Sequence, residues 1–220
     1  KWSASTSHAS TAPEKKGEKA SEPAPTKATQ APAKFYVKLD TSKGDVVMEV
    51  VREWAPRGAD RFYELVNEGF FDGGRFYRVL RGFAAQFGIS KDAKLNELWR
   101  QLLLPDDPVK QSNKRGYVSF ATRGPSTRST QVFINLKNNS NLDSRGFAPF
   151  ARVVEGIENI DKLYAGYGEV MTLGGSGPDP AKLEAMGDER NGQRILGRSG
   201  QNGAADRHDD GSDQEVGWAA

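Results

Sequence analysis

The alternation of apolar and polar residues first becomes regular at Phe35, where it predicts a β-hairpin. Phe35–Asp40 and Asp45–Val51 are two alternating runs, and a Thr-Ser-Lys-Gly turn connects them. After Pro56, which the first turn of a helix tolerates, the spacing becomes helical and continues to Gly69. We therefore expect a helix of about three turns, whose apolar face consists of Ala59, Phe62, Leu65 and Val66.

The region between Phe70 and Val153 consists of short β-branched and aromatic runs separated by Gly, Pro, Asn and Asp. These runs predict strands at Arg75–Leu80, Phe83–Ile89, Gly116–Ala121, Gln131–Asn135 and Phe147–Val153. A second helix is predicted from Gly156, because the apolar residues that follow share one helical face. Many short strands at this spacing favour a barrel or a sandwich. We expect a mostly β fold, namely a closed antiparallel β-barrel capped by two α-helices.

The composition divides the chain into four segments. Residues 1–34, rich in Ala, Pro, Lys and Ser, predict a disordered tether, because they contain too little apolar surface to offset the entropy of ordering. Residues 35–168 form the predicted domain, and 169–187 form a Gly/Pro-rich extension. Residues 188–220 form an atypical polar tail that we also expect to be disordered. Within the domain, Asp92–Asp107 is apolar enough to pack back on the body.

Charge and composition narrow the possible chemistry. The net charge of +2 gives no case for a nucleic-acid partner. The chain has no cysteine, and its two histidines, His8 and His208, lie in the polar terminal segments. Thiolate nucleophiles, imidazole metal sites and Ser-His-Asp triads are therefore not expected in the domain, and we expect neither a cofactor nor a metal ion.

The terminal residues also carry an expectation about location. No apolar run is long enough for a membrane span or a signal peptide. Because the chain opens on Lys1, we expect an exported or periplasmic monomer whose signal or anchor was removed, with a cytoplasmic location as the alternative.

Five sequence blocks carry a more specific signal. They are Gly74–Leu80, Arg81–Gly88, Ser119–Pro125, Ser129–Asn135 and Asn141–Phe150. In this order and at these separations, after a hairpin and a helix, they resemble the cyclophilin family of peptidyl-prolyl cis-trans isomerases. The resemblance extends from the start of the hairpin at residue 35 to about residue 168, and the insertion at 92–107 makes it more similar to the bacterial branch.

The resemblance implies a set of site residues. The family's catalytic arginine corresponds to Arg78, and Gln86 is implied as the second catalytic residue. Implied substrate-binding residues are the apolar floor Phe83, Phe133 and Leu142, the polar Gln131, the backbone-binding Ala121 and Thr122, and Phe147 as the nearest counterpart of the family's pocket histidine.

Three positions near these residues depart from the family's pattern. Tyr77 replaces the histidine of the common Phe-His-Arg block, and we expect it to face away from Arg78 and to matter little. Ala84 replaces a methionine, and Thr122 replaces an asparagine. These departures leave room for a weakened enzyme, although the arginine, the glutamines and the apolar floor are intact.

Isomerisation of an X-Pro bond is chemistry that needs neither His nor Cys. The barrier of about 18–20 kcal/mol comes from amide resonance, and no atom is transferred. A guanidinium can donate to the substrate carbonyl and toward the proline nitrogen as resonance is lost, while an apolar cup holds the ring. We expect an isomerase acting on proline-containing unfolded or partly folded polypeptides. The alternative is a non-catalytic proline-peptide binding module of the same fold.

Taken singly, the charged residues have plainer interpretations. An isolated arginine such as Arg78 is usually a surface ion-pair partner, and Asp106 and Asp107, placed between two prolines, indicate a turn rather than an acid–base pair. A solvated rim around the site is the expectation for three further arginines, Arg123, Arg128 and Arg145.

The C-terminal part differs most from the family. The glycine-rich run at 174–177 lacks the Lys-Ser/Thr of a phosphate cradle. After Gly187 no alternating apolar run appears, so no closing strand is predicted, and Phe35–Asp40 would keep an exposed edge. Two explanations stay open: a shifted reading frame or gene boundary near Gly187, and a natural tail in which Arg190–Leu196 supplies the strand.

Overall fold

The computed structural model describes residues 30–187 and 215–219. Its strands are β1 (Lys34–Thr41), β2 (Gly44–Val51), β3 (Gly74–Arg75), β4 (Arg78–Leu80), β5 (Ala84–Phe87), β6 (Tyr117–Phe120), β7 (Val132–Asn135), β8 (Pro149–Glu155) and β9 (Glu215–Ala219). Its helices are α1 (Pro56–Asn67), α2 (Ala93–Gln101), α3 (Ile157–Asp161) and α4 (Pro180–Met186), with 3-10 turns at Ser140–Arg145 and Met171–Leu173.

The predicted hairpin and first helix are confirmed. β1 and β2 pair antiparallel along their whole length, and Gly44 closes the turn with a φ of +116°, which an L side chain rarely adopts. Helix α1 begins at Pro56 and buries the apolar face predicted for it. The predicted strand Arg75–Leu80 is divided into β3 and β4, because Phe76 and Tyr77 leave the ladder, and the ring of Phe76 packs 5.0 Å from that of Phe87 in the core.

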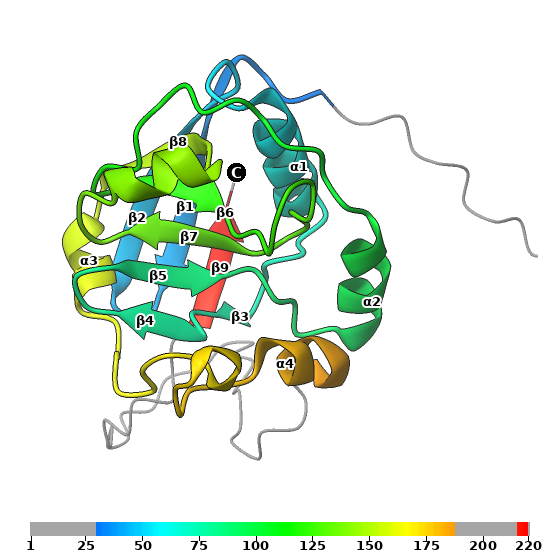
Figure 1. The fold of residues 1–220 in the computed structure, drawn as a ribbon, viewed down its shortest axis with the longest axis vertical. Coiled ribbons are helices and arrows are strands. Elements are labelled where there is room, and N and C mark those ends of the chain that lie inside the picture. Colours follow the sequence, from blue (N-terminus) through cyan, green and yellow to red (C-terminus); the bar gives the residue numbers. More distant parts are fainter. Residues whose placement is uncertain (1–29, 188–214, 220) are drawn as a thin grey trace, which may run out of the picture.

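The strands form one mostly antiparallel sheet with the order β3-β9-β1-β2-β8-β6-β7-β5-β4. In Figure 1, β4, β5 and β7 run across β1, β2 and β9, so the sheet folds over on itself. The space between is filled by the main core, whose largest fully buried side chains are Phe62, Phe70, Phe71, Phe87, Phe120 and Phe150. The two edge strands, β3 and β4, are consecutive in the chain, but no ladder joins them in the described part, so the expected closure is not made by backbone pairing.

The number of helices differs from the expectation of two. The excursion at Asp92–Asp107 contains α2, which Asp92 caps by accepting from the backbone N–H of Lys94 at 2.8 Å. This helix packs on the body through Trp99, whose ring lies 6.3 Å from that of Phe70. α4 lies against α2, and both helices stand at one side of the sheet (Figure 1). Within the described ranges, no helix is both long and apolar enough to cross a membrane.

The expectation of an unpaired edge at β1 is wrong. β9 pairs antiparallel with β1, from Lys38 opposite Ala219 to Thr41 opposite Val216, and its other side pairs with β3. Val216 and Trp218 do alternate with Glu215 and Gly217, but the run is too short and contains a glycine, so the pattern does not predict a strand. Backbone N–H and C=O groups make the ladder. Arg190–Leu196, the segment proposed to supply the strand, lies outside the described residues, as do most of both tails.

The boundary of the N-terminal tether also moves. Residues 30–34 are described, and the backbone N–H of Ala31 donates to Asp60 Oδ1 at 2.9 Å. Lys34 already belongs to β1 and pairs with Glu49 at 2.9 Å. Contacts with the body of the domain are therefore already made by residues that precede the predicted start at Phe35.

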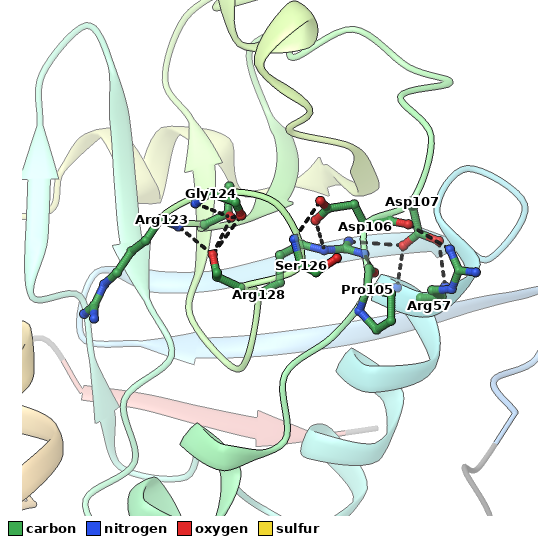
Figure 2. Close-up of polar contacts among 11 residues, drawn as sticks. Arg57, Pro105, Asp106, Asp107, Arg123, Gly124, Ser126 and Arg128 are labelled. Carbon is green, nitrogen blue, oxygen red and sulfur yellow. Dashed lines mark hydrogen bonds and ion pairs between the residues drawn. The ribbon is translucent and has the colours of Figure 1, made fainter.

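A buried carboxylate, Asp107, joins three parts of the chain (Figure 2). Its oxygens accept the backbone N–H groups of Arg57 and Gly58 at 3.1 and 2.9 Å, which caps the N-terminus of α1. They also accept Arg128 Nη1 at 3.1 Å. Arg128 is 2% exposed, so its expected place on a solvated rim is wrong; Asp106 joins the same network by accepting from the Ser126 N–H.

We expect Asp107→Ala to lower the free energy of unfolding by about 2–4 kcal/mol, because it removes the cap of α1 and leaves the buried guanidinium of Arg128 with only the more exposed Asp106 as a charge partner. Urea unfolding monitored by circular dichroism measures this. The matched control is Glu97→Ala, which removes an exposed carboxylate paired with Arg100 and should change stability by less than about 1 kcal/mol. Equal small effects of the two substitutions would contradict the anchoring role of Asp107.

A chain that ends before Glu215 should lose the β1–β9 ladder. We expect faster exchange of the backbone amides within Lys38–Thr41, and a stability lower by a few kcal/mol, at about 0.5–1.5 kcal/mol per hydrogen bond. Hydrogen exchange read by mass spectrometry measures both. The amides of β2 that face β8 serve as the internal control, and unchanged exchange in Lys38–Thr41 would argue against the pairing.

Candidate active site

The sheet register brings the predicted catalytic residues onto one face. Arg78 on β4 lies opposite Gln86 on β5, and Gln86 lies opposite Phe133 on β7. Residues directly opposite each other in neighbouring antiparallel strands project to the same side. Three side chains from distant parts of the sequence therefore form one line across the sheet.

Hydrogen bonds connect the polar side chains on this face. Arg78 Nη1 donates to Gln86 Oε1 at 3.1 Å, and Gln86 Nε2 donates to Gln131 Oε1 at 3.2 Å. We call Arg78, Gln86 and Gln131 the polar row. The predicted catalytic pair and the predicted polar contact are thus brought together. The row is only partly exposed, with 9% of Gln86 accessible.

An apolar cluster lies beside the polar row. Phe133, Leu142 and Ala84 are buried in it, and Phe83, Ala121 and Phe147 pack against them. The rings of Phe133 and Phe147 meet edge to face with centroids 5.7 Å apart. The cluster contains every apolar residue predicted for the site, and its partly exposed members form an apolar surface at the position expected for a proline ring.

Arg78 contacts both halves of the site. Its Cζ lies 5.5 Å from the centroid of the Phe83 ring, a distance that permits a cation–π interaction. On its other side, Nε and Nη2 donate to the two carboxylate oxygens of Glu169 at 2.6 and 2.7 Å. Hydrogen bonding to Arg78 lowers the pKa of Glu169, so this carboxylate stays ionised near neutral pH. A second cation, Arg145, lies 5.5 Å from the Phe147 ring at the border of the cluster.

The two residues predicted to bind a substrate backbone, Ala121 and Thr122, follow the end of β6 and differ in their contacts. Ala121 packs on the apolar cluster, and its N–H donates to the carbonyl of Gln131 at 2.9 Å. The hydroxyl of Thr122 turns into the following loop, where it bonds the carbonyl of Gly124 and lies 2.9 Å from Thr127 Oγ1. The hydroxyl of Thr122 is therefore used to shape the loop.

A polar network bonds the backbone of two members of the apolar cluster, and sequence reasoning missed it. Asn113 is fully buried and donates to Asp143 Oδ1 and to the carbonyl of Phe147, both at 2.8 Å. Asn139 donates to the carbonyl of Phe83 at 3.0 Å. No local pattern marks these asparagines, because their partners lie far away in sequence.

Tyr77 makes a contact with the polar row that sequence reasoning did not foresee. Its ring is buried beside Ile89 and Val170. Its hydroxyl nevertheless donates to Gln131 Oε1 at 2.6 Å and so contacts the polar row from behind. Burial raises the pKa of Tyr77, so the hydroxyl remains a donor.

Two acidic residues of the C-terminal extension were also missed. Glu169 holds Arg78, and Glu184 on α4 accepts from Gln131 Nε2 at 2.5 Å. The only sequence signal was the glycine-rich run that follows Glu169. Within the described ranges, no group of three or more His, Cys, Asp or Glu side chains is arranged to hold a metal ion.

Comparisons with known proteins agree with this arrangement. The family model for cyclophilin type peptidyl-prolyl cis-trans isomerase/CLD matches residues 36–179. Peptidyl-prolyl cis-trans isomerase-like 3 of Homo sapiens is 31% identical over 130 residues, which are 58% of this chain and 80% of that protein. Peptidyl-prolyl cis-trans isomerase A of Dickeya dadantii (strain 3937) is 34% identical over 140 residues, 58% of this chain and 70% of that protein.

A solved structure supports the fold. Cyclophilin AquaCyp293 from Hirschia baltica superposes with a TM-score of 0.51 at 18% identity, covering 66% of this chain and 69% of that one. The relatives come from a human and a bacterium, so membership of the bacterial branch stays a prediction. Both are named as isomerases, and nothing favours the non-catalytic alternative. The chain therefore belongs to the cyclophilin-type peptidyl-prolyl cis-trans isomerase family.

Proposed function

We propose that this isomerase turns X-Pro bonds with Arg78 as its catalytic cation, Gln86 as the partner of Arg78, and the apolar cluster as the seat of the proline ring. The observation that carries the proposal is the contact between the two halves: Arg78 bonds Gln86 and also lies over the ring of Phe83. A ring seated on the cluster would therefore place its peptide bond beside the guanidinium.

Arg78 retains donors for a substrate. A guanidinium has five N–H groups, and three of those of Arg78 are directed at Glu169 and Gln86. The remaining N–H groups, one on Nη1 and one on Nη2, have no partner among the described residues. They are the groups that we propose to donate to the substrate carbonyl and, in the twisted state, toward the proline nitrogen.

This arrangement lowers the rotational barrier by differential binding. In the planar ground state the nitrogen lone pair is delocalised into the carbonyl, and in the twisted state it is localised and accepts a hydrogen bond. Arg78 therefore binds the twisted state more strongly than the planar state. A gain of about 6 kcal/mol corresponds to a rate increase of roughly 10⁴-fold. The apolar cluster contributes by excluding the water that stabilises the more polar planar amide.

The clients that we propose are proline-containing segments of unfolded or partly folded polypeptides. The support is that the site consists of an apolar surface and a hydrogen-bond donor, which recognise a proline ring and a carbonyl rather than a particular sequence. We also propose a barrel that is completed between β3 and β4 by the two residues that connect them, Phe76 and Tyr77, since both of their side chains are buried. An exported or periplasmic location and a monomeric state stay predictions.

Arg78→Ala should lower isomerase turnover by about 10²–10³-fold, because it removes a preorganised donor from the transition state. A protease-coupled assay on an X-Pro peptide measures this, with circular dichroism to establish that the fold is retained. Arg52→Ala is the matched control, because Arg52 binds Asp60 through Nε and Nη2 in the same way but lies outside the site. Unchanged turnover in Arg78→Ala would refute the proposed role. A peptide that binds the parent protein without acceleration would indicate a binding module.

A further inference from the structure

We propose that Glu169 and Glu184 are positioning residues that hold the polar row in one orientation from its two ends. The inference rests on the proposed catalytic function of Arg78. Both carboxylates belong to the C-terminal extension at 169–187, to which the sequence assigned no role. Glu184 also lies beyond residues 36–179, the range that the family model matches.

At the first end, Glu169 determines the direction of the guanidinium. It binds Nε and Nη2 with two short parallel hydrogen bonds, which is the bidentate geometry that fixes an arginine in its plane. The side chain of Arg78 is 13% exposed and that of Glu169 is 30% exposed, so solvent reaches the guanidinium less than it reaches the carboxylate. The outer N–H groups of Arg78 are consequently held in a fixed direction beside the Phe83 ring.

The extension is built to hold Glu169 in place. The N–H of Gly177 donates to the carbonyl of Glu169 at 2.8 Å, and that of Gly175 donates to the carbonyl of Val170 at 3.1 Å. A Cβ on Gly175 would collide with the carbonyl oxygen of Glu169, and one on Gly177 would approach it to 2.8 Å. Val170 is buried against Tyr77, which attaches the loop to the body. The glycine-rich run therefore serves to close this loop behind Glu169.

At the second end, Glu184 determines the orientation of two amides. A glutamine amide can flip, which exchanges its accepting oxygen and its donating nitrogen. A carboxylate only accepts, so Glu184 selects the orientation in which Gln131 Nε2 points toward it. Gln131 Oε1 then faces Gln86 Nε2, and Gln86 Oε1 faces Arg78. Because Arg78 only donates, this is the single orientation in which donors and acceptors match along the whole row.

Two further contacts support this orientation. The Tyr77 hydroxyl donates to the same Gln131 Oε1, which favours the oxygen at that position. The backbone of Glu184 is held by Asn96 of α2, whose Nδ2 donates to the Glu184 carbonyl at 3.3 Å. Asn96 is 4% exposed and also bonds Ser90. The inserted helix α2 thereby fixes the position of α4 and of its carboxylate.

The first experiment removes the carboxylate at Arg78. Glu169→Ala should lower kcat by about 10-fold with a small change in KM, because a catalytic donor that is misdirected loses its effect in the transition state. Glu169→Gln, which keeps one acceptor, should lose less. The Nε–H signal of Arg78 in ¹⁵N-edited NMR should exchange with water faster in Glu169→Ala. The control is Asp60→Asn, which breaks the same kind of bidentate pair at Arg52 and should leave kcat unchanged.

The second experiment replaces the hydrogen-bond acceptor at the Glu184 end of the polar row with a donor. Glu184→Lys places a donor where an acceptor is required, so donors and acceptors can no longer match along the whole row. Either Gln131 turns its oxygen to the lysine and loses its bonds with Gln86 and Tyr77, or Gln86 also flips and presents its nitrogen to Arg78. We expect a kcat lower by about 10-fold. Glu184→Gln can still accept from Gln131 and should retain most of the activity. Ala185→Lys puts a lysine on the exposed side of the same helix and serves as the control for the introduction of a lysine there.

The results separate this inference from the proposed function. If Arg78→Ala abolishes turnover while Glu169→Ala and Glu184→Lys match the parent, positioning by the two carboxylates is wrong and the catalytic role of Arg78 stands. If Arg78→Ala itself has no effect, the proposed function fails first. An equal loss in Glu184→Lys and Glu184→Gln would show that charge, and not the orientation of the amides, matters at that end. A change of KM in Glu169→Ala and Glu184→Lys, with kcat unchanged, would likewise overturn the inference.

Discussion

The register of β4 against β5, and of β5 against β7, is the constraint on which the site depends. It places Arg78, Gln86 and Phe133 in a line although they are separated by up to 55 positions in the numbering. A slip by one residue would turn every side chain of the shifted strand to the opposite face. The register itself is held from the other face of these strands, where Val79, Ala85 and Ile134 are buried in the main core. Packing on one face thus determines the chemistry on the other.

The loops around the site are held in place by hydrogen bonds to buried polar side chains. Asp107 connects the start of α1 to Arg128, and Asn113 connects Asp143 to the backbone of Phe147. Asp107, Arg128 and Asn113 are buried and hydrogen-bonded, so moving a loop would leave a desolvated polar atom without a partner, which costs about 1–3 kcal/mol or more. A site that works by directing donors, without transferring a group, needs such rigidity.

Much of the fold and of the site could be predicted from the sequence. The hairpin and α1 follow from periodicity, because one face of each must be buried, and that requirement is local. The apolar floor and the pair Arg78 and Gln86 follow from the resemblance of ordered motifs, and the structure brings all of them together. The chemistry also follows, since a domain without His or Cys can still catalyse a rotation that transfers no atom.

Other features were decided only in three dimensions. A side chain's partners depend on which distant segments pack beside it, so Arg128 became a buried ion-pair partner and Tyr77 came to contact Gln131 from behind. The pairing of β9 with β1 uses backbone groups that every residue except proline shares, and so composition could not indicate it. The sequence by itself therefore determined the elements and the candidate chemistry. Tertiary structure alone decided which carboxylates hold Arg78 and Gln131, because Glu169 and Glu184 reach them across 91 and 53 residues of chain.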